Sequence, residues 1–245
     1  MQKIINISDL GEVIIKKFKN SKSEKLFINK KGTIVVSIPF FVPYSEGENF
    51  LKKNINWVRQ QLCKVEKKID EKKFTPDSIF ITRKHELKFI AHDYITAKGN
   101  IRENIINISY NPITDDFQNN DFQKFIIKVI AAALKKEANE YIIPRFENIA
   151  KNHNFKYKSV KIGNAKTRWG CCDKNNNIIL SNSLILLQDN LIDFIIFHEL
   201  CHIVHKNHSK EFHSLLDKLL NGNEKEYSKQ INNFSIEIKP GNYRY

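Results

Sequence analysis

The chain has 245 residues, which is enough for one large domain or two smaller ones with a substantial hydrophobic core. Its composition, with 41% hydrophobic residues and 17 phenylalanines, is typical of a folded globular protein and excludes an intrinsically disordered chain. The formal charge of +13 would suit contact with nucleic acid or another polyanion. However, the basic residues are scattered from Lys3 to Arg244, which indicates a general compositional bias rather than a focused binding patch.

Cysteine use and hydropathy bear on the cellular compartment. The chain contains four cysteines and no CxxC pair, a pattern typical of a reducing compartment: Cys63, Cys171, Cys172 and Cys201. The N-terminus lacks an apolar segment long enough for a signal peptide, and no apolar run approaches the length that spans a bilayer. We therefore expect a cytoplasmic protein without membrane spans.

In the first half of the chain we expect two groups of strands. The first group covers residues 13–18, 25–28 and 33–38, and the second covers residues 78–82, 86–91, 94–97 and 104–110. Between the groups, Ser45 and Glu48 form a capping box that predicts the start of a helix. Lys98-Gly99-Asn100 is expected to be a turn. A polar linker over 111–120 then predicts a β-rich N-terminal region over 1–115 and a second domain over 116–245.

The second half begins with a pattern that predicts a long helix over 121–152. Pro144 should kink this helix or divide it in two. Residues 157–168 and 177–182 are strand-like, and the polar turn between them suggests a hairpin. Helices and strands together make the expected fold class α+β.

The motif that carries chemistry is H-E-x-x-H, at His198, Glu199 and His202, on a strongly apolar helix that begins near Leu191. Positions i and i+4 of a helix share one face, so both imidazoles can reach one ion, and Glu199 lies beside them. The five-residue motif also occurs by chance on core helices. Its setting on a buried helix, followed by further histidines, favours a catalytic zinc site in a hydrolase.

A catalytic zinc usually takes three protein ligands and keeps one position open. His208 lies ten residues after His198 and can return to the site if the helix ends near Asn207. Ser209 would then cap the next helix, which fits such a break. Three other residues remain alternatives for the third ligand: His205, Glu224 and Glu226.

Three stretches of the chain resemble the YgjP-like metallopeptidase family, which is related to the SprT-like and WLM zinc peptidases. They are Lys166-Thr167-Arg168-Trp169-Gly170-Cys171-Cys172, then Ile179-Leu180-Ser181-Asn182, and Phe197-His198-Glu199-Leu200-Cys201-His202 followed by His208, Ser209 and Phe212. The resemblance implies a zincin-like catalytic domain, in which the HExxH helix packs on a small antiparallel sheet after a β-rich N-terminal region. It also implies that His198, His202 and His208 bind Zn²⁺, and that Glu199 activates a zinc-bound water to cleave a peptide bond.

Arg168 and Trp169 come just before the turn at Gly170, where the guanidinium group would orient a carboxylate, a phosphate or a carbonyl group of a substrate. Together with His205 they are our candidates for substrate binding. In the alternative interpretation, Trp169 packs in the core and Arg168 forms an ion pair. The chain departs from the family pattern at three positions, which bear on the substrate more than on the metal: Cys171, Ser181 and His213.

Two other functions remain open beside a peptidase acting on peptides or proteins. A metal-dependent nucleotide phosphohydrolase would use the same metal site, and the positive charge of the chain would favour it. A nucleic-acid-binding protein with a structural zinc would have a closed metal site with no open coordination position. We expect the peptidase because the resemblance supports it.

Overall fold

A computed structural model describes residues 2–7, 10–29, 32–70, 73–93, 95–165 and 167–244, and for residues 64–70 it describes the backbone alone. The chain divides into two compact units, residues 1–72 and residues 73–245. The sequence predicts a boundary at residues 115/116 instead. The difference arises because the second group of strands shares a hydrophobic core with the long helix that follows it, through Phe80, Ile106 and Ile126 among others.

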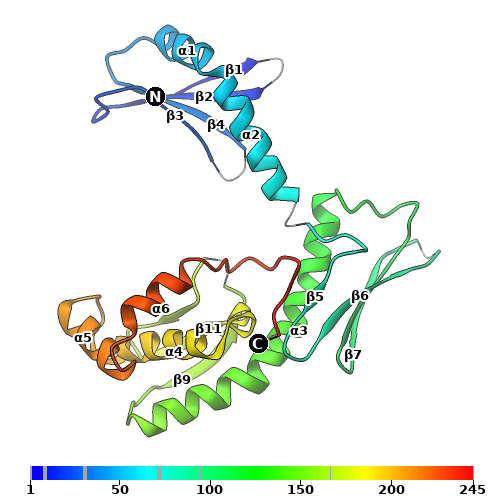
Figure 1. The fold of residues 1–245 in the computed structure, drawn as a ribbon, viewed down its shortest axis with the longest axis vertical. Helices are drawn as coiled ribbons and strands as arrows, with labels where there is room; N and C mark the ends of the chain where they lie inside the picture. The colour runs from blue at the N-terminus through cyan, green and yellow to red at the C-terminus, as the bar shows by residue number, and fades with distance from the viewer. Residues whose placement is uncertain are drawn as a thin grey trace. The chain divides into compact units, whose positions relative to one another are not determined.

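The N-terminal unit consists of a four-stranded sheet and two helices (Figure 1). Its elements are β1 (Gln2–Ile7), β2 (Gly11–Phe18), β3 (Lys25–Ile28), β4 (Ile34–Pro39), α1 (Tyr44–Lys53) and α2 (Ile55–Asp70). The strand order is β1-β2-β4-β3, and β2 and β4 are parallel while the outer pairs are antiparallel. Leu51 and Val58 of the helices are fully buried against sheet residues such as Val13 and Ile34.

The predicted capping box is wrong. Helix α1 begins at Tyr44, with Pro43 at the N-cap position and no side-chain cap, so Ser45 lies inside the first turn where it cannot serve as the cap. The expected single helix is also two helices. They meet at Asn54, whose side-chain amide donates to the carbonyl of Phe50 at 2.8 Å.

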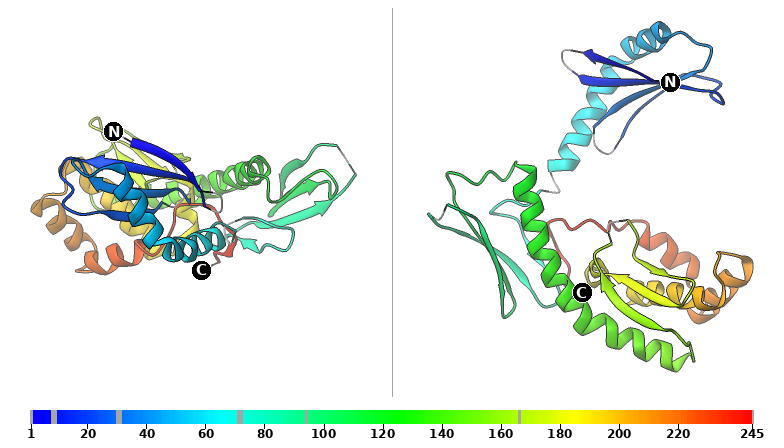
Figure 2. Two further views of the ribbon diagram at one scale, coloured as in Figure 1. Left: turned by 90° about the horizontal axis from the view of Figure 1, so that it is seen from above. Right: turned by 180° about the vertical axis from the view of Figure 1, so that it is seen from behind.

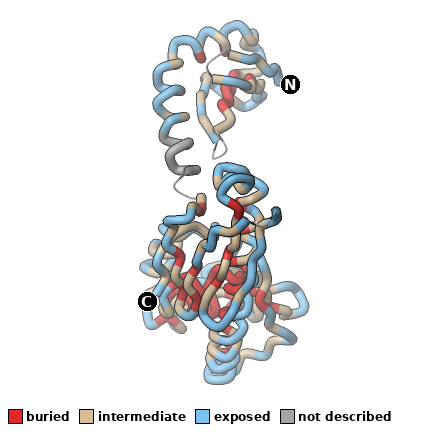
Figure 3. The backbone as a smooth tube through the Cα atoms, turned by 90° about the vertical axis from the view of Figure 1, so that its right-hand side faces the viewer, coloured by how far each residue is buried: buried red, intermediate tan, exposed pale blue. Residues whose placement is uncertain are grey.

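The C-terminal unit contains two sheets with the long helix α3 between them (Figures 1 and 2). Its elements are β5 (Phe80–Ile81), β6 (Glu86–Ala91), β7 (Lys98–Arg102), β8 (Ile105–Tyr110), α3 (Asn120–Asn152), β9 (Ser159–Gly163), β10 (Gly170–Cys172), β11 (Asn177–Ser181), the 3-10 helix η1 (Asn182–Leu186), α4 (Asp189–Val204), α5 (Lys210–Leu219), α6 (Glu224–Ile231) and β12 (Gly241–Asn242). The strand orders are β12-β5-β6-β8-β7 and β10-β11-β9. Buried residues gather in each unit (Figure 3), and the expected α+β class is confirmed.

Helix α3 runs from Asn120 to Asn152 without being divided at Pro144. A proline inside a helix costs about 3 kcal/mol, because it removes a hydrogen bond and crowds the preceding turn. Ile142 and Phe146, on either side of the proline, are fully buried, so packing on both sides offsets this cost. The undivided helix can therefore pack against both sheets.

Two local predictions fail because strand pairing depends on distant contacts. Residues 98–100 lie in β7 rather than in a turn, and a Cβ on Gly99 would lie 2.3 Å from a methyl carbon of Val129, so this glycine lets the strand approach α3 closely. β9 and β11 are parallel, and the hairpin is β10–β11 instead. The small sheet is therefore mixed rather than antiparallel. Among the described residues, no helix is long and apolar enough to span a membrane.

Candidate metal centre

Helix α4 carries His198, Glu199 and His202, and most of its other residues are buried. The helix ends at Val204, before the predicted end near Asn207, because His205 at the C-cap takes an extended conformation with φ −122° and ψ 106°. A short loop then leads to α5, whose N-cap is Ser209 as the sequence predicts. The Ser209 hydroxyl accepts a hydrogen bond from the backbone N–H of Phe212 at 3.4 Å. The loop between the helices brings His208 back towards α4.

Three histidines converge at the end of α4. The ring nitrogens that His198, His202 and His208 can offer to a metal all lie within 4.8 Å of one another, and the Nε2 atoms of His198 and His208 are 3.1 Å apart. In the part of the chain that the structure describes, this is the one group of three or more His, Cys, Asp or Glu side chains suited to hold a metal ion. The alternative ligands, His205, Glu224 and Glu226, are not part of it.

The histidines rest on the ring of Phe212, which is fully buried. The centroid of this ring lies 5.0 Å from that of His198, 4.7 Å from that of His202 and 4.8 Å from that of His208. The Nδ1 atom of His202 lies 3.1 Å from the backbone carbonyl oxygen of His205, a hydrogen bond that leaves Nε2 of His202 free for an ion. One aromatic ring and one backbone carbonyl thus orient the imidazoles.

Burial keeps two of these imidazoles neutral. Burial first, and then the neighbouring histidines His202, His208 and His213, together lower the pKa of His198 to about 4. Burial also lowers the pKa of His202, against the raising effect of its hydrogen bond to the carbonyl of His205. A neutral imidazole is the form that binds a metal, so near pH 7 these side chains are ready to do so.

Glu199 is buried beside the histidines, with 5% of its surface exposed. Its Oε2 atom has no hydrogen-bond partner among the described residues. Burial raises the pKa of Glu199 to about 7, although the positive charge of Arg168 acts in the opposite direction. Strand β10 runs directly past the carboxylate, since a Cβ on Gly170 would lie 2.7 Å from Oε1 of Glu199. Glycine at this position therefore leaves the room that the carboxylate occupies.

The structure places the three substrate-binding candidates differently. Arg168 is exposed, and its charge acts on the carboxylate of Glu199. Trp169 is half-buried against the hydrophobic core, and its carbonyl accepts a hydrogen bond from the backbone N–H of Ser181 at 2.8 Å. His205 contributes its backbone carbonyl to the orientation of His202. Contact of these residues with a substrate stays a prediction.

Gly170 and Phe212 belong to the stretches that resemble the family, and the structure gives them roles that the sequence does not indicate. Gly170 makes space for Glu199, and Phe212 supports all three histidines. Both roles depend on contacts between distant parts of the chain. Glu224, an alternative ligand, lies instead 2.5 Å from the Nδ1 atom of His213, in a contact that links α5 and α6.

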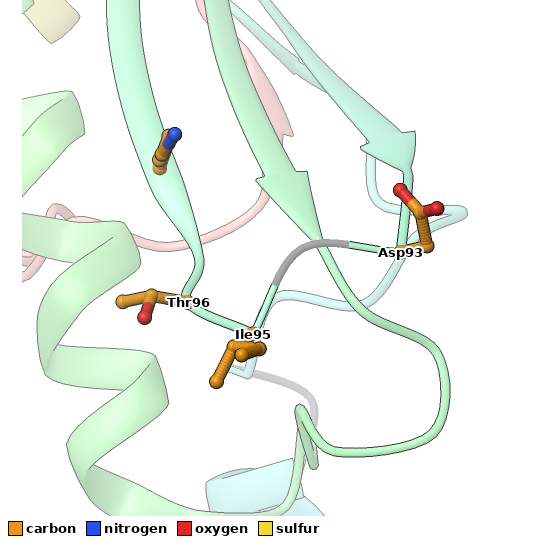
Figure 4. Close-up of a pocket in the computed structure, with 4 residues that line it drawn as sticks. Asp93, Ile95 and Thr96 are labelled. Carbon is orange, nitrogen blue, oxygen red and sulfur yellow. The ribbon is translucent and has the colours of Figure 1, made fainter.

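A hollow of about 400 Å³ lies elsewhere in the C-terminal unit, at the connection between β6 and β7 (Figure 4). It is lined by Asp93, Ile95, Thr96 and Lys98. None of these residues belongs to the histidine group, and Figure 1 shows β6 and β7 on the other side of α3 from α4. The hollow is therefore not part of the candidate metal centre.

A model of one protein family, described as "YgjP-like, metallopeptidase domain", matches residues 22–234. The chain belongs to the YgjP-like metallopeptidase family. This membership identifies a metal-dependent hydrolase of the peptidase class, with a peptide or protein as the expected substrate. It gives no support to contact with nucleic acid.

Two solved structures share a distant likeness with part of the chain. The metallopeptidase zymogen abylysin of Pyrococcus abyssi is 22% identical with a TM-score of 0.34, and the match covers 38% of this chain and 92% of that one. For the metallopeptidase zymogen jannalysin of Methanocaldococcus jannaschii the identity is 23%, the TM-score 0.34 and the coverage 38% and 94%. No curated protein matched the chain. The likeness to the zymogens is too distant to carry an argument about function.

Proposed function

We propose that this YgjP-like protein is a zinc peptidase in which His198, His202 and His208 hold the ion and Glu199 is the general base. One observation carries the proposal. Three imidazole nitrogens lie within 4.8 Å of one another, and Glu199, next to His198 in α4, has a buried carboxylate whose Oε2 atom has no hydrogen-bond partner among the described residues. Burying a carboxylate without a hydrogen-bond partner costs free energy. Such costly groups are typical of catalytic sites.

The donor set fits zinc. Neutral imidazoles are common zinc ligands, and three protein ligands leave a position open for water or substrate. Two nitrogens bound to a tetrahedral zinc lie about 3.3 Å apart. The Nε2 atoms of His198 and His208 lie 3.1 Å apart, close to that value. The hydrogen bond from Nδ1 of His202 to the carbonyl of His205 leaves Nε2 of His202 as the donor.

When bound, zinc would supply Lewis-acid chemistry by making water more acidic and polarising the substrate carbonyl group. Glu199 takes the proton from the attacking water and passes it to the leaving amine. A pKa of about 7 suits both steps, because the carboxyl group can accept and release a proton near neutral pH. Gly170 leaves the carboxylate room, and the charge of Arg168 favours its ionised form.

The base is tested by comparing wild type with Glu199→Gln on a mixture of peptides, with the zinc content of both proteins measured. We expect the variant to retain its zinc and to lose peptide cleavage by a factor of about 10²–10⁴, because glutamine has nearly the same shape but cannot accept the proton. Equal rates of cleavage in the two proteins would overturn the role of Glu199.

The ligands are tested by a matched pair of histidine variants, His208→Ala and His205→Ala. His208→Ala should lose tight zinc binding, whereas His205→Ala should keep it because the backbone carbonyl of residue 205 remains. Zinc is measured by competition with a chromogenic chelator. Loss of zinc in His205→Ala alone would show that the third ligand is assigned wrongly.

A further inference from the structure

His208 differs from the other two histidines of the metal centre in what holds it. His198 and His202 are part of α4, so the helix fixes their positions, but His208 is an exposed residue on the loop between α4 and α5. A loop residue keeps a precise position only if the loop itself is attached to a rigid part of the molecule. The attachments of this loop therefore decide how well the third histidine is placed.

Two side-chain hydrogen bonds hold the loop locally, and the ring of His208 also packs on Phe212, with the ring centroids 4.8 Å apart. At its start, the carbonyl oxygen of His205 accepts a hydrogen bond from His202, and at its end the hydroxyl of Ser209 accepts one from the backbone N–H of Phe212. Both join the loop to the helices next to it in the sequence. The two hydrogen bonds fix where the helices end, but not where the backbone between them lies.

A further attachment reaches a distant part of the chain. The Nζ atom of Lys206, two residues before His208, donates to the side-chain oxygen of Asn176 at 2.6 Å and to the backbone carbonyl of Asp173 at 3.2 Å. Both acceptors belong to the turn between β10 and β11. One ammonium group thus joins the loop of the third histidine to the hairpin whose first residue, Gly170, lies against Glu199.

The turn is a rigid acceptor. The carboxylate of Asp173 accepts hydrogen bonds from the backbone N–H groups of Asn175 and Asn177 at 2.8 and 2.9 Å, and from the side chain of Asn177 at 2.9 Å. These bonds lower the pKa of Asp173, so the carboxylate stays ionised and bonded. Asn176 has a positive φ of 60°, a conformation that asparagine tolerates better than most residues. The hydrogen bonds within the turn therefore fix the two acceptors of Lys206 independently of the lysine itself.

We propose that Lys206 is a positioning residue, which holds the loop between α4 and α5 against the β10–β11 turn and so fixes His208 as the third ligand. The inference rests on the proposed metal site. In this arrangement the ammonium group binds neither metal nor substrate. It acts by positioning His208. It also joins the loop that carries this ligand to the β10–β11 hairpin, whose strand β10 runs past Glu199.

The test measures zinc affinity in the full-length chain with Lys206→Met and Lys206→Arg. Removing a group that supports a metal ligand typically weakens metal binding by a factor of about 10–100, so we expect a loss of about tenfold in Lys206→Met. Lys206→Arg keeps a donor and should recover part of the affinity. The control is Lys210→Met, which also removes one positive charge two residues from His208; the side chain of Lys210 forms no hydrogen bond or ion pair within the described part of the chain.

Two further variants separate positioning from a general effect on folding. Asn176→Gly keeps the positive φ but removes one acceptor, so it should weaken zinc binding in the same direction as Lys206→Met. In a His208→Ala background, Lys206→Met should weaken the residual affinity for zinc no further, because the ligand that Lys206 positions is gone. A lysine that merely stabilised the fold would weaken binding in both backgrounds.

The outcomes are distinct. Zinc affinity in Lys206→Met equal to wild type, an equal loss in Lys210→Met, or an undiminished loss in the His208→Ala background would each overturn the positioning role. If wild type itself binds no zinc, the proposed function fails instead. The two failures are therefore distinguishable in the same titration.

Discussion

The carboxylates at the two ends of α4 differ in their burial and in their bonding partners. At the N-terminal end, Asp193 pairs with Arg145 through two bonds of 2.5 and 2.8 Å, and Asp189 pairs with Arg83 at 2.7 Å. These acidic side chains are partly exposed to solvent. At the other end Glu199 is buried, and one of its oxygens has no hydrogen-bond partner among the described residues. Within the described part of the chain, the partly exposed carboxylates thus have cationic partners, whereas Oε2 of the buried Glu199 has no hydrogen-bond partner.

This contrast separates groups that stabilise the molecule from Glu199, for which we propose a catalytic role. Partly exposed ion pairs contribute modestly to stability, and here they join the start of α4 to α3 and to the turn after β5. An unpaired buried carboxylate destabilises the fold, because ionisation without water or a partner is costly. Such a cost is expected where a carboxyl group must exchange protons near pH 7. In the proposed mechanism, one helix therefore combines a stabilising end at Asp189 and Asp193 with a reactive end at Glu199.

The largest effect is expected from filling the space beside the reactive end. In Gly170→Ala the new Cβ would lie 2.7 Å from Oε1 of Glu199, so the carboxylate must move. We expect peptide cleavage to fall about 100-fold, since a displacement of about 1 Å in a catalytic group can cost that much. The control is Gly163→Ala in the same sheet, where the Cβ would lie 2.7 Å from a methyl carbon of Ile179. Equal activity in the two variants would contradict the role of Gly170.

A smaller effect concerns the stability of the zinc-free protein. The folded-state pKa of Glu199 is raised from 4.5 to about 7, so the folded protein keeps a proton that the unfolded chain releases between these values. The contribution of Glu199 to stability therefore falls as pH rises through this window and stays low above it. Glutamine mimics the protonated form, so Glu199→Gln should be more stable than wild type at pH 8, by at most about 3 kcal/mol.

The difference in the free energy of unfolding between wild type and Glu199→Gln should shrink towards zero at pH 4, where glutamate and glutamine at position 199 are both neutral. His198, whose pKa is lowered from 6.5 to about 4, has the opposite sign: its contribution is complete above pH 6.5 and is lost as pH falls through 4. Because His198 is present in both proteins, the comparison isolates Glu199. The measurement is urea denaturation in the presence of a chelator, and a difference independent of pH would refute the assignment.

The smallest effect is expected at the stabilising end of the helix. Arg145→Gln removes the paired bonds to Asp193 and should lower the free energy of unfolding by about 2 kcal/mol, the range of hydrogen bonds between charged groups. Zinc affinity and the rate of peptide cleavage per folded molecule should stay unchanged, because the pair lies at the far end of α4. A change in zinc affinity as large as that of His208→Ala would erase the distinction between the two ends.

The sequence predicts local features of the site well and its distant contacts poorly. The spacing of His198 and His202 follows from helix geometry alone, and Ser209 marks the helix start that brings His208 back. The proximity of Gly170 and Glu199 depends on β10 lying at the edge of a mixed sheet, and no local pattern specifies that β9 and β11 are parallel. The division at residues 72/73 likewise depends on strands packing against a helix that comes later in the chain.

The ring of Phe212 connects the metal centre to the interior of the protein. It belongs to the main hydrophobic core and also touches all three histidines, so the third histidine reaches its place only when α5 is docked on α4. His198 and His202 are brought together by the helix itself, whereas His208 joins them through tertiary structure. In the proposed zinc site, binding of the ion and docking of α5 are therefore thermodynamically linked, and each strengthens the other by the same free energy.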